Sequence, residues 1–323
     1  MLVPLTMTCT LGESSSPWQA LLMLRAQLRQ PPPGAAALYL VRSGATWRCD
    51  TQAGPADEVH AIALDGPAPA WAVPQGNGLG APPPAFLRLY LPIVLAAAAA
   101  ARQGRVHVTG HLAQTLDGRI ACTSGDSQWI GNQANLRHAH RLRALHDAIL
   151  VGRHTVERDN PQLTVRHVPG THPKRLVLNG TASTVHHRHE LNVYAGPGCT
   201  LVCNREHAAA ALQQGLDVIA LDPERDGRLP LPQLLHALAA RGVHSLFVEG
   251  GGRTLSGFLA AGAIDLLHVH VTPRILGSGV PGFVLPEVPQ IAQARRLTAE
   301  HFDLDGELLF VCRPEIALPE PRG

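Results

Sequence analysis

Charged residues are scarce in this chain of 323 residues, and its cysteines form no pattern. Only 16% of the residues are charged and the formal net charge is +2, so we expect no basic surface for nucleic acid. The six cysteines include no Cys-x-x-Cys pair, which is typical of free thiols in a reducing compartment. The start lacks a basic segment followed by an apolar core, so we expect no secretion and a cytoplasmic location.

Long hydrophobic runs are also lacking. The most apolar run covers residues 89–101 and contains Pro92. A bilayer-spanning helix needs about 20 such residues, so this run predicts a packed helix and no membrane partner.

A metal site is not expected either. His186, His187 and His189 lie near Cys199 and Cys203, but the two cysteines are four residues apart on a predicted strand. Their sulfur atoms would then be roughly 13 Å apart, which is too far for two ligands of one zinc ion. Most of the 18 histidines are instead interpreted as surface groups that replace lysine.

Hydrophobic residues are plentiful, at 45%, and two compositional regimes follow one another. Residues 1–104 are rich in Ala, Pro and Gly, and we interpret them as an accessory module of unknown function. A helix is expected there at 18–28, with strands at 37–41 and 59–64. Residues 105–315 alternate between strands and helices, which predicts an α/β fold with a doubly wound, mostly parallel sheet and helices on both faces.

The elements expected in the second regime are short. Strands are predicted at 106–108, 148–151, 175–178, 200–202, 218–220, 245–248 and 266–271, and residues 307–312 are expected to close the sheet as an antiparallel edge strand. Helices are predicted at 132–145, 231–241 and 254–261, with a short helix or turn at 155–159. In such a sheet, ligands bind beyond the carboxyl ends of the strands.

A glycine-rich turn follows one of these strands. Residues 246–257 read LFVEGGGRTLSG, so Glu249 is followed by three glycines and then by a helix. Glycines let backbone amides approach an anion, and a helix start adds a favourable dipole. The turn therefore predicts a phosphate site, although an ordinary strand-to-helix turn would look similar. The strict G-x-G-x-x-G spacing of dinucleotide folds is absent.

Two arginines, Arg143 and Arg166, flank the predicted strand at 148–151. Guanidinium groups suit phosphate oxygens, but each arginine could equally pair with a surface carboxylate. A second tight turn carries Ser127 and Trp129, and its indole is either a lid over the core or a stacking surface.

Six segments together resemble a known family, the reductase domain of riboflavin biosynthesis. They occur in that family's order and spacing, and they are AQTLDGRIA (113–121), GDSQWI (125–130), HRLRALHDAILVG (140–152), TVERDNPQLTVR (155–166), VEGGGRTLSGFL (248–259) and IDLLHVHVTPRILGSG (264–279).

The resemblance implies a dihydrofolate-reductase-like fold, NADPH as cofactor and a homodimer. The family reduces 5-amino-6-(5-phosphoribosylamino)uracil, or its diaminopyrimidinone analogue, to the ribitylamino form. The residues implied to bind substrate are Ser127, Arg143, Leu163, Arg166 and Glu249. Those implied to bind the coenzyme are Ala113, Trp129, Thr155, Asp159, Gly251, Gly252, Arg253, Thr254, Leu255, Ser256 and Gly257.

The reduction also requires a proton for the substrate nitrogen. Asp159 or water is the first hypothesis for the donor, and Glu249 is the second. Asn179 stands where the family usually has Asp after its third strand, which leaves ribose and 2′-phosphate recognition open.

Other functions stay open. The zinc-deaminase signature, His-x-Glu with Pro-Cys-x-x-Cys, is absent from residues 1–104, so no deamination is expected. One alternative is a reductase of another aminopyrimidine or of a pterin. A nucleotide-binding regulator without catalytic activity is the alternative from another class.

Overall fold

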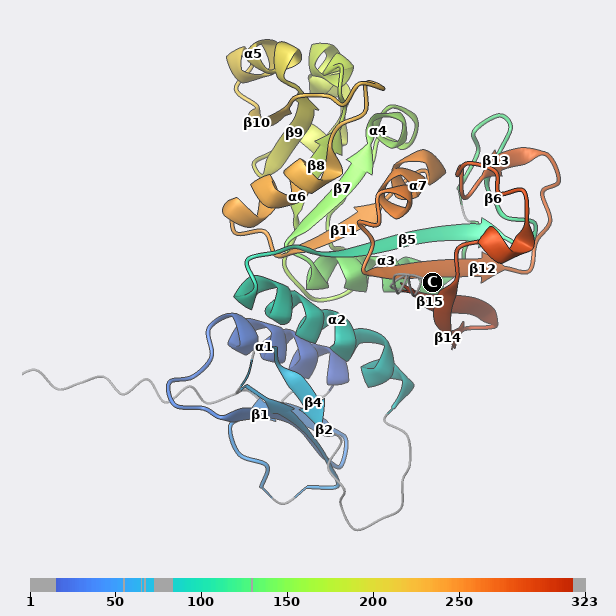
Figure 1. Cartoon of the computed structure of the whole chain (residues 1–323). Coiled ribbons are helices and arrows are strands. Elements are labelled where there is room, and N and C mark those ends of the chain that lie inside the picture. Colours follow the sequence, from blue (N-terminus) through green and yellow to red (C-terminus); the bar gives the residue numbers. More distant parts are fainter. Residues whose placement is uncertain are drawn as a thin grey trace, which may run out of the picture. The chain divides into compact units, whose positions relative to one another are not determined.

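The chain divides into two compact units, Met1–Gln103 and Gly104–Gly323, each with its own sheet (Figure 1). The structure is a computed structural model, which describes residues 16–54, 56–64, 66, 68–72, 84–128 and 130–315.

In its described residues the first unit contains a four-stranded antiparallel sheet with the strand order β2-β1-β3-β4, and two helices. Its elements are α1 (Pro17–Arg29), β1 (Ala37–Ser43), β2 (Thr46–Asp50), β3 (Glu58–Ala63), β4 (Ala70–Ala72) and α2 (Ala85–Arg102). Ser16 caps α1, because its hydroxyl accepts a hydrogen bond from the Gln19 amide. The helix and strands expected from the sequence are confirmed.

The helix α2 is longer than the sequence pattern predicted. It runs for 18 residues and includes Pro92. By length and composition it is the one helix of the described residues that could cross a membrane, with a mean hydropathy of 1.5. Half of it is buried inside the protein, however, as in a core helix. It packs on α1, where Trp18 meets Tyr90 edge-on at 5.9 Å between ring centroids.

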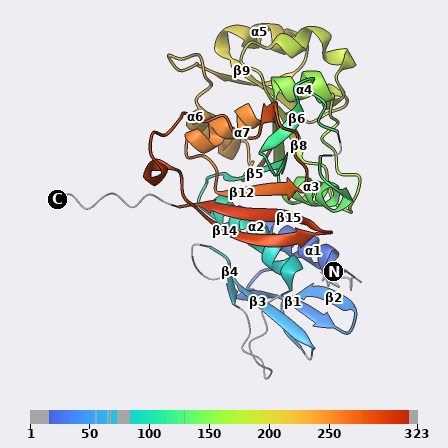
Figure 2. The same cartoon turned by 90° about the vertical axis from the view of Figure 1, so that its right-hand side faces the viewer.

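The second unit contains a nine-stranded sheet with the order β10-β9-β8-β7-β11-β5-β12-β15-β14. Its last three strands, β12, β15 and β14, lie side by side in Figure 2. The strands are β5 (His107–Thr115), β7 (Ala148–Gly152), β8 (Lys174–Leu178), β9 (Cys199–Asn204), β10 (Asp217–Leu221), β11 (Ser245–Glu249), β12 (Leu266–Thr272), β14 (Leu297–Leu304) and β15 (Glu307–Pro314). The helices are α3 (Gln133–Leu145), α4 (Arg153–Asp159), α5 (Arg205–Gln213), α6 (Leu231–Ala240) and α7 (Gly252–Ala260), with short 3-10 helices η1 (Ser183–Glu190), η2 (Asn192–Tyr194) and η3 (Ile291–Gln293).

Neighbouring strands from β10 to β12 are parallel, which confirms the expected doubly wound α/β sheet. The final strands differ from the prediction. β15 pairs antiparallel with β12 as expected, but β14 pairs with its other side and forms the edge. A small pair, β6 (Arg119–Cys122) with β13 (Gly279–Pro281), was also missed. β6 and β13 were missed because they lie far apart in the sequence, whereas β14, which forms a hairpin with β15, was missed because it is a half-exposed edge strand.

Helices cover the two faces of the central strands differently. A Cβ on Gly110 would collide with Leu255 of α7, so Gly110 faces α7. The next residue, His111, faces the opposite side and contacts His138 of α3. Alternate residues of a strand point to opposite faces, so β5 separates an α7 side from an α3 side.

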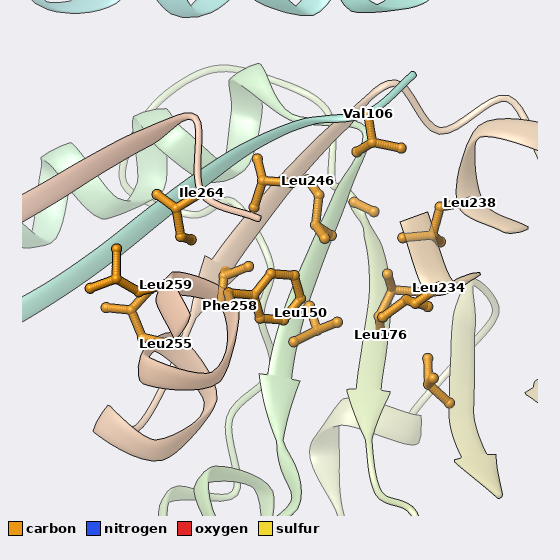
Figure 3. Close-up of a cluster of buried hydrophobic side chains, with 14 of the residues drawn as sticks. Val106, Leu150, Leu176, Leu234, Leu238, Leu246, Leu255, Phe258, Leu259 and Ile264 are labelled. Atoms are coloured by element: carbon orange, nitrogen blue, oxygen red, sulfur yellow. The ribbon is translucent and has the colours of Figure 1, made fainter. Parts of the chain in front are cut away.

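The α7 side carries the main apolar core. Buried side chains of α6 and α7 pack there on β5, β7, β8 and β11 (Figure 3). The labelled members are Val106, Leu150, Leu176, Leu234, Leu238, Leu246, Leu255, Phe258, Leu259 and Ile264. Each large side chain buried in this way contributes about 2 kcal/mol to folding.

The expectation that most histidines lie at the surface was wrong for a large group of them. Eight are buried, namely His60, His107, His111, His138, His140, His146, His268 and His270. The physical reason is that buried imidazoles find polar partners, often remote in sequence. His138 Nε2 lies 3.0 Å from His268 Nδ1, and the two rings are stacked. His111 donates to the Asn135 side chain at 3.1 Å.

These imidazoles predict a fold that is sensitive to acid. Burial lowers the pKa of His107 and His111 to about 4 and holds those of His138 and His268 well below the ordinary value. Below pH ~6.5 these imidazoles bind protons in the unfolded chain but stay neutral in the folded chain. The free energy of unfolding therefore decreases as the pH is lowered from about 6.5 to about 4. When all four imidazoles are protonated only in the unfolded chain, the free energy of unfolding decreases by about 5 kcal/mol per pH unit. This is comparable with the whole stability of a typical domain.

We therefore expect the urea midpoint, followed by circular dichroism, to drop steeply between about pH 6.5 and pH 5. His138→Leu should flatten this dependence by roughly one proton, while the same change at the exposed His186 should leave it as in the parent protein. A midpoint that stays constant over this range would contradict the assignment.

Candidate functional site

The glycine turn joins the carboxyl end of β11 to the start of α7. Gly251 precedes the helix, which has no side-chain cap, and its amide donates to the Thr155 hydroxyl at 3.2 Å. A Cβ at Gly252 would lie 2.5 Å from the Gly282 carbonyl oxygen, so only glycine fits there. The first amides of an α-helix have no acceptor within the helix and favour an anion. The turn thus has the backbone geometry of a phosphate site.

The residues predicted to bind coenzyme from Gly251 to Gly257 fall into two groups. Arg253 is exposed and Thr254 half-buried at the start of α7. Leu255 instead lies in the apolar core, and the Ser256 hydroxyl accepts a hydrogen bond from the Val284 amide at 2.8 Å. Because these two side chains are used inside the protein, the part of the turn that can meet a ligand is its first four residues.

Asp159 is the last residue of α4, one helical turn after Thr155. Residues four apart share a helix face, so Asp159 is on the face that meets the glycine turn. Partial burial raises the pKa of its carboxyl, against the opposing effect of Arg158. Arg158 also reaches the loop of Ser127, because a Cβ at Gly125 would lie 3.0 Å from its guanidinium.

The two remaining predicted coenzyme residues, and the Asn179 that replaces the family's usual Asp, have different outcomes. Ala113 lies on β5 near its carboxyl end, directly opposite His270 of β12. Trp129 lies outside the described residues. Asn179 points inward with 2% exposure, and its amide donates to the Thr184 hydroxyl at 2.9 Å. Its side chain therefore organises the start of η1.

Arg143 and Glu249 form a bidentate ion pair on the α3 side of the sheet. Arg143 Nε donates to Glu249 Oε2 at 2.8 Å and Nη2 donates to Oε1 at 2.5 Å. The side chain of Arg143 is only 9% exposed and that of Glu249 23% exposed. Two parallel charge-assisted hydrogen bonds fix the orientation of both groups. The pair connects the last turn of α3 to the strand end that precedes the glycine turn.

This pair sets the charge of Glu249. Burial opposes ionisation of its carboxyl, but the Arg143 guanidinium outweighs that effect and lowers the pKa. Arg143 is affected in the opposite way, since Glu249 raises its pKa despite burial. In this arrangement Glu249 is an anion at neutral pH, so it accepts hydrogen bonds.

The turn formed by residues 163–166 lies beside this pair. Arg143 Nη1 donates to the Thr164 carbonyl oxygen at 3.0 Å. Leu163 is buried and has a positive φ of 55°, which is uncommon for a non-glycine residue and costs backbone energy. Arg166 is exposed, and its Nη1 donates to the Thr164 hydroxyl at 2.7 Å. The structure therefore brings together Arg143, Leu163, Arg166 and Glu249, four of the five residues that the resemblance implied to bind substrate, and substrate binding by them stays a prediction.

Sequence reasoning missed two histidines of this region, His140 and His172. The Arg166 amide donates to His140 Nδ1 at 2.9 Å, and the Val165 amide donates to His172 Nδ1 at 3.1 Å. The signal for His140 was its position three residues before Arg143, since residues three apart share a helix face. Among the described residues, no group of three or more His, Cys, Asp or Glu side chains could hold a metal ion.

Comparison with known proteins identifies the family. The model of the RibD C-terminal domain matches residues 106–308, which is more than half of the chain. The chain belongs to the RibD C-terminal domain family.

Two curated relatives illustrate this membership. The chain is 35% identical over 180 residues to riboflavin biosynthesis protein RibD of Aquifex aeolicus, a match that covers 55% of this chain and 49% of the relative. It is 36% identical over 180 residues to the 2,5-diamino-6-ribosylamino-4(3H)-pyrimidinone 5′-phosphate reductase of Methanothermobacter thermautotrophicus, covering 54% and 80%. The chain spans about half the length of the bacterial RibD relatives that it matches.

Solved structures show the same fold. A deaminase/reductase from Thermotoga maritima superimposes with a TM-score of 0.58 at 26% identity, covering 68% of this chain and 60% of that one. The RibD structure from Acinetobacter baumannii has a TM-score of 0.60 at 18% identity and covers 92% and 97%. The second likeness concerns the fold alone.

The glycine turn supports a test by a matched pair of substitutions. Gly252→Ala should lower the melting temperature by several degrees, because the new methyl group meets the carbonyl oxygens of Pro281 and Gly282 at 2.7 and 2.5 Å. Gly257→Ala should raise it slightly, because this position is helical, has nothing within 4 Å and gains about 1 kcal/mol of helix propensity. Calorimetric melting of both variants checks the prediction. Equal shifts of the melting temperature would show that Pro281 and Gly282 do not limit the space at Gly252.

Proposed function

We propose that this protein reduces 5-amino-6-(5-phosphoribosylamino)uracil, or its diaminopyrimidinone analogue, to the ribitylamino form with NADPH. The observation that carries the proposal is the position of Glu249. It belongs to the charged cluster of Arg143 and Arg166 on one side and directly precedes the glycine turn on the other. A sugar-borne anion and a coenzyme bound at these two places would meet at the carboxyl end of β11. The relatives that carry reductase names support the same activity.

The residues present fit a dinucleotide at the glycine turn. The open start of α7 offers amides to a diphosphate, with the Thr155 hydroxyl beside it and the exposed Arg253 in the first turn. When bound there, a reduced nicotinamide supplies the hydride for the reaction. Asp159 lies on the α4 face that borders this turn. NADPH is proposed as the coenzyme by analogy with the family.

The substrate would lie on the α3 side. Arg166 has an exposed guanidinium that suits a phosphate, whereas two nitrogens of the Arg143 guanidinium, Nε and Nη2, already donate to Glu249. The ionised Glu249 can accept hydrogen bonds from the amino groups of a pyrimidine or from a ribose hydroxyl. Ser127, in the loop over Arg158, and Leu163, in its buried turn, complete the proposed substrate residues.

The protein's contribution to the chemistry is mainly positioning. The ribosylamine opens to an imine, its sugar C1′ accepts a hydride and its nitrogen accepts a proton. Glu249 is an anion in its pair with Arg143, so in that arrangement it holds no proton to donate. Asp159, whose pKa is raised by partial burial, or a bound water remains the proposed donor.

The first unit is proposed to be an accessory module without deaminase activity, since its sequence lacks the zinc-deaminase signature. A cytoplasmic location and a homodimer are part of the same proposal. Free thiols support the location, because the five cysteines in the described residues form no disulfide.

Turnover with the phosphoribosylamino-pyrimidine tests the function. We expect the protein to oxidise NADPH only when this substrate is present. Asp159→Asn should slow turnover about a hundredfold, the lower end of a general acid's contribution, with little change in the NADPH dissociation constant. Asp226→Asn, at an exposed aspartate in the loop before α6, serves as the control.

Each other outcome favours a different function. NADPH binding without turnover would indicate a regulator, and turnover with only another aminopyrimidine or a pterin would change the substrate. Absence of NADPH binding would refute the proposal, and near-normal turnover of Asp159→Asn would refute the role of Asp159.

A further inference from the structure

The turn that carries Arg166 is held at three consecutive residues by side chains from outside it. Arg143 donates to the Thr164 carbonyl oxygen at 3.0 Å. The amides of Val165 and Arg166 donate to the rings of His172 and His140, at 3.1 and 2.9 Å. Three successive backbone groups fixed in this way leave the turn little freedom. This support from outside the turn also explains why Leu163, the first residue of the turn, can keep its positive φ of 55°.

His140 is the most deeply buried of these three supporting side chains. It is fully buried on α3, and its Nε2 lies 3.4 Å from Arg143 Nη1. Because a backbone amide can only donate, His140 Nδ1 must carry no proton. A neutral ring then carries its proton on Nε2, so Nε2 and Arg143 Nη1 are both donors and their 3.4 Å contact is not a hydrogen bond.

The charges around His140 keep it in that neutral state. Burial, followed by the neighbouring Arg143, His167 and Arg166, lowers its pKa to about 3, against the opposing effect of Glu249. The ring of His167 meets it edge-on at 4.5 Å between centroids. His140 is therefore neutral beside the Arg143 guanidinium, and its Nδ1 can fix the Arg166 backbone without adding a further positive charge.

We propose that His140 is a positioning residue for a phosphate-monoester subsite, in which it fixes the Arg166 turn relative to Arg143. The subsite would take the phosphate of a pentose 5-phosphate group. The inference rests on the proposed function for the identity of that group. It assigns His140 no contact with the substrate, because the ring is fully buried. Its effect should appear in phosphate affinity and not in coenzyme affinity.

The test compares two substitutions with ribose 5-phosphate as the probe. His140→Asn places an amide oxygen near the position of Nδ1 and can still accept from the Arg166 amide, whereas His140→Leu cannot. Binding measured by calorimetry should weaken about tenfold or more in the Leu variant, since a buried amide loses its acceptor and the turn loosens. It should return to near the parent value in the Asn variant. NADPH affinity should be unchanged in both, and His186→Leu, at an exposed histidine, is the matched control.

Several results would overturn the inference. These are parent-like ribose 5-phosphate binding by His140→Leu, an Asn variant as weak as the Leu variant, and no binding by the parent protein. Should the Leu variant not fold, His172→Leu and His172→Asn repeat the comparison at the exposed support of the same turn. Binding of ribose 5-phosphate that depends on His140, without reduction of the pyrimidine, would refute the proposed function and leave this inference intact.

Discussion

The bidentate pair of Arg143 and Glu249 is the interaction on which the rest of the site depends. A guanidinium as buried as that of Arg143 is costly unless a carboxylate compensates it, and removal of one partner from such a pair costs about 3 to 5 kcal/mol. The pair joins α3 to the end of β11, and the third nitrogen of the guanidinium holds the Thr164 carbonyl. One ion pair thus fixes a helix, a strand end and a loop against each other, and it keeps Glu249 ionised.

Strand geometry explains why two different surfaces meet at this pair. Gly110 and His111 are neighbours on β5 but face α7 and α3. The α7 side carries the apolar core, and the glycine turn lies at the carboxyl end of β11, where α7 begins. The α3 side is polar, and the charged cluster lies at its end. β11 ends at Glu249, which pairs with Arg143 and directly precedes the glycine turn. The apolar α7 side and the polar α3 side of the sheet therefore share this strand end.

Features of the site that are local in sequence could be predicted, and features that depend on remote partners could not. The glycine turn with Glu249 occupies one continuous segment, and the alternation of strands and helices gave the sheet. The buried histidines escaped notice because their partners are distant, as with His138 and His268, whose rings are 130 residues apart along the chain. Edge strand β14 was missed for another reason, since it is half-exposed and pairs only with β15. The sequence also could not show that Glu249 accepts from two nitrogens of the Arg143 guanidinium, because the two residues are 106 positions apart.

The neutral histidines of the α3 side have a consequence for this pair. His111 lies opposite Glu249 on the neighbouring strand, and burial lowers its pKa to about 4 although the Glu249 charge acts in the opposite direction. His140, which lies next to Arg143 on α3, is neutral as well. A charged imidazolium at either place would compete with Arg143 for the carboxylate and repel its guanidinium. Because both rings are uncharged at neutral pH, Glu249 has one cationic hydrogen-bond partner in the described structure. Imidazole supplies polar contacts here that lysine or arginine could supply only with an added charge, which explains why a polar face of this sheet is built so largely from histidine.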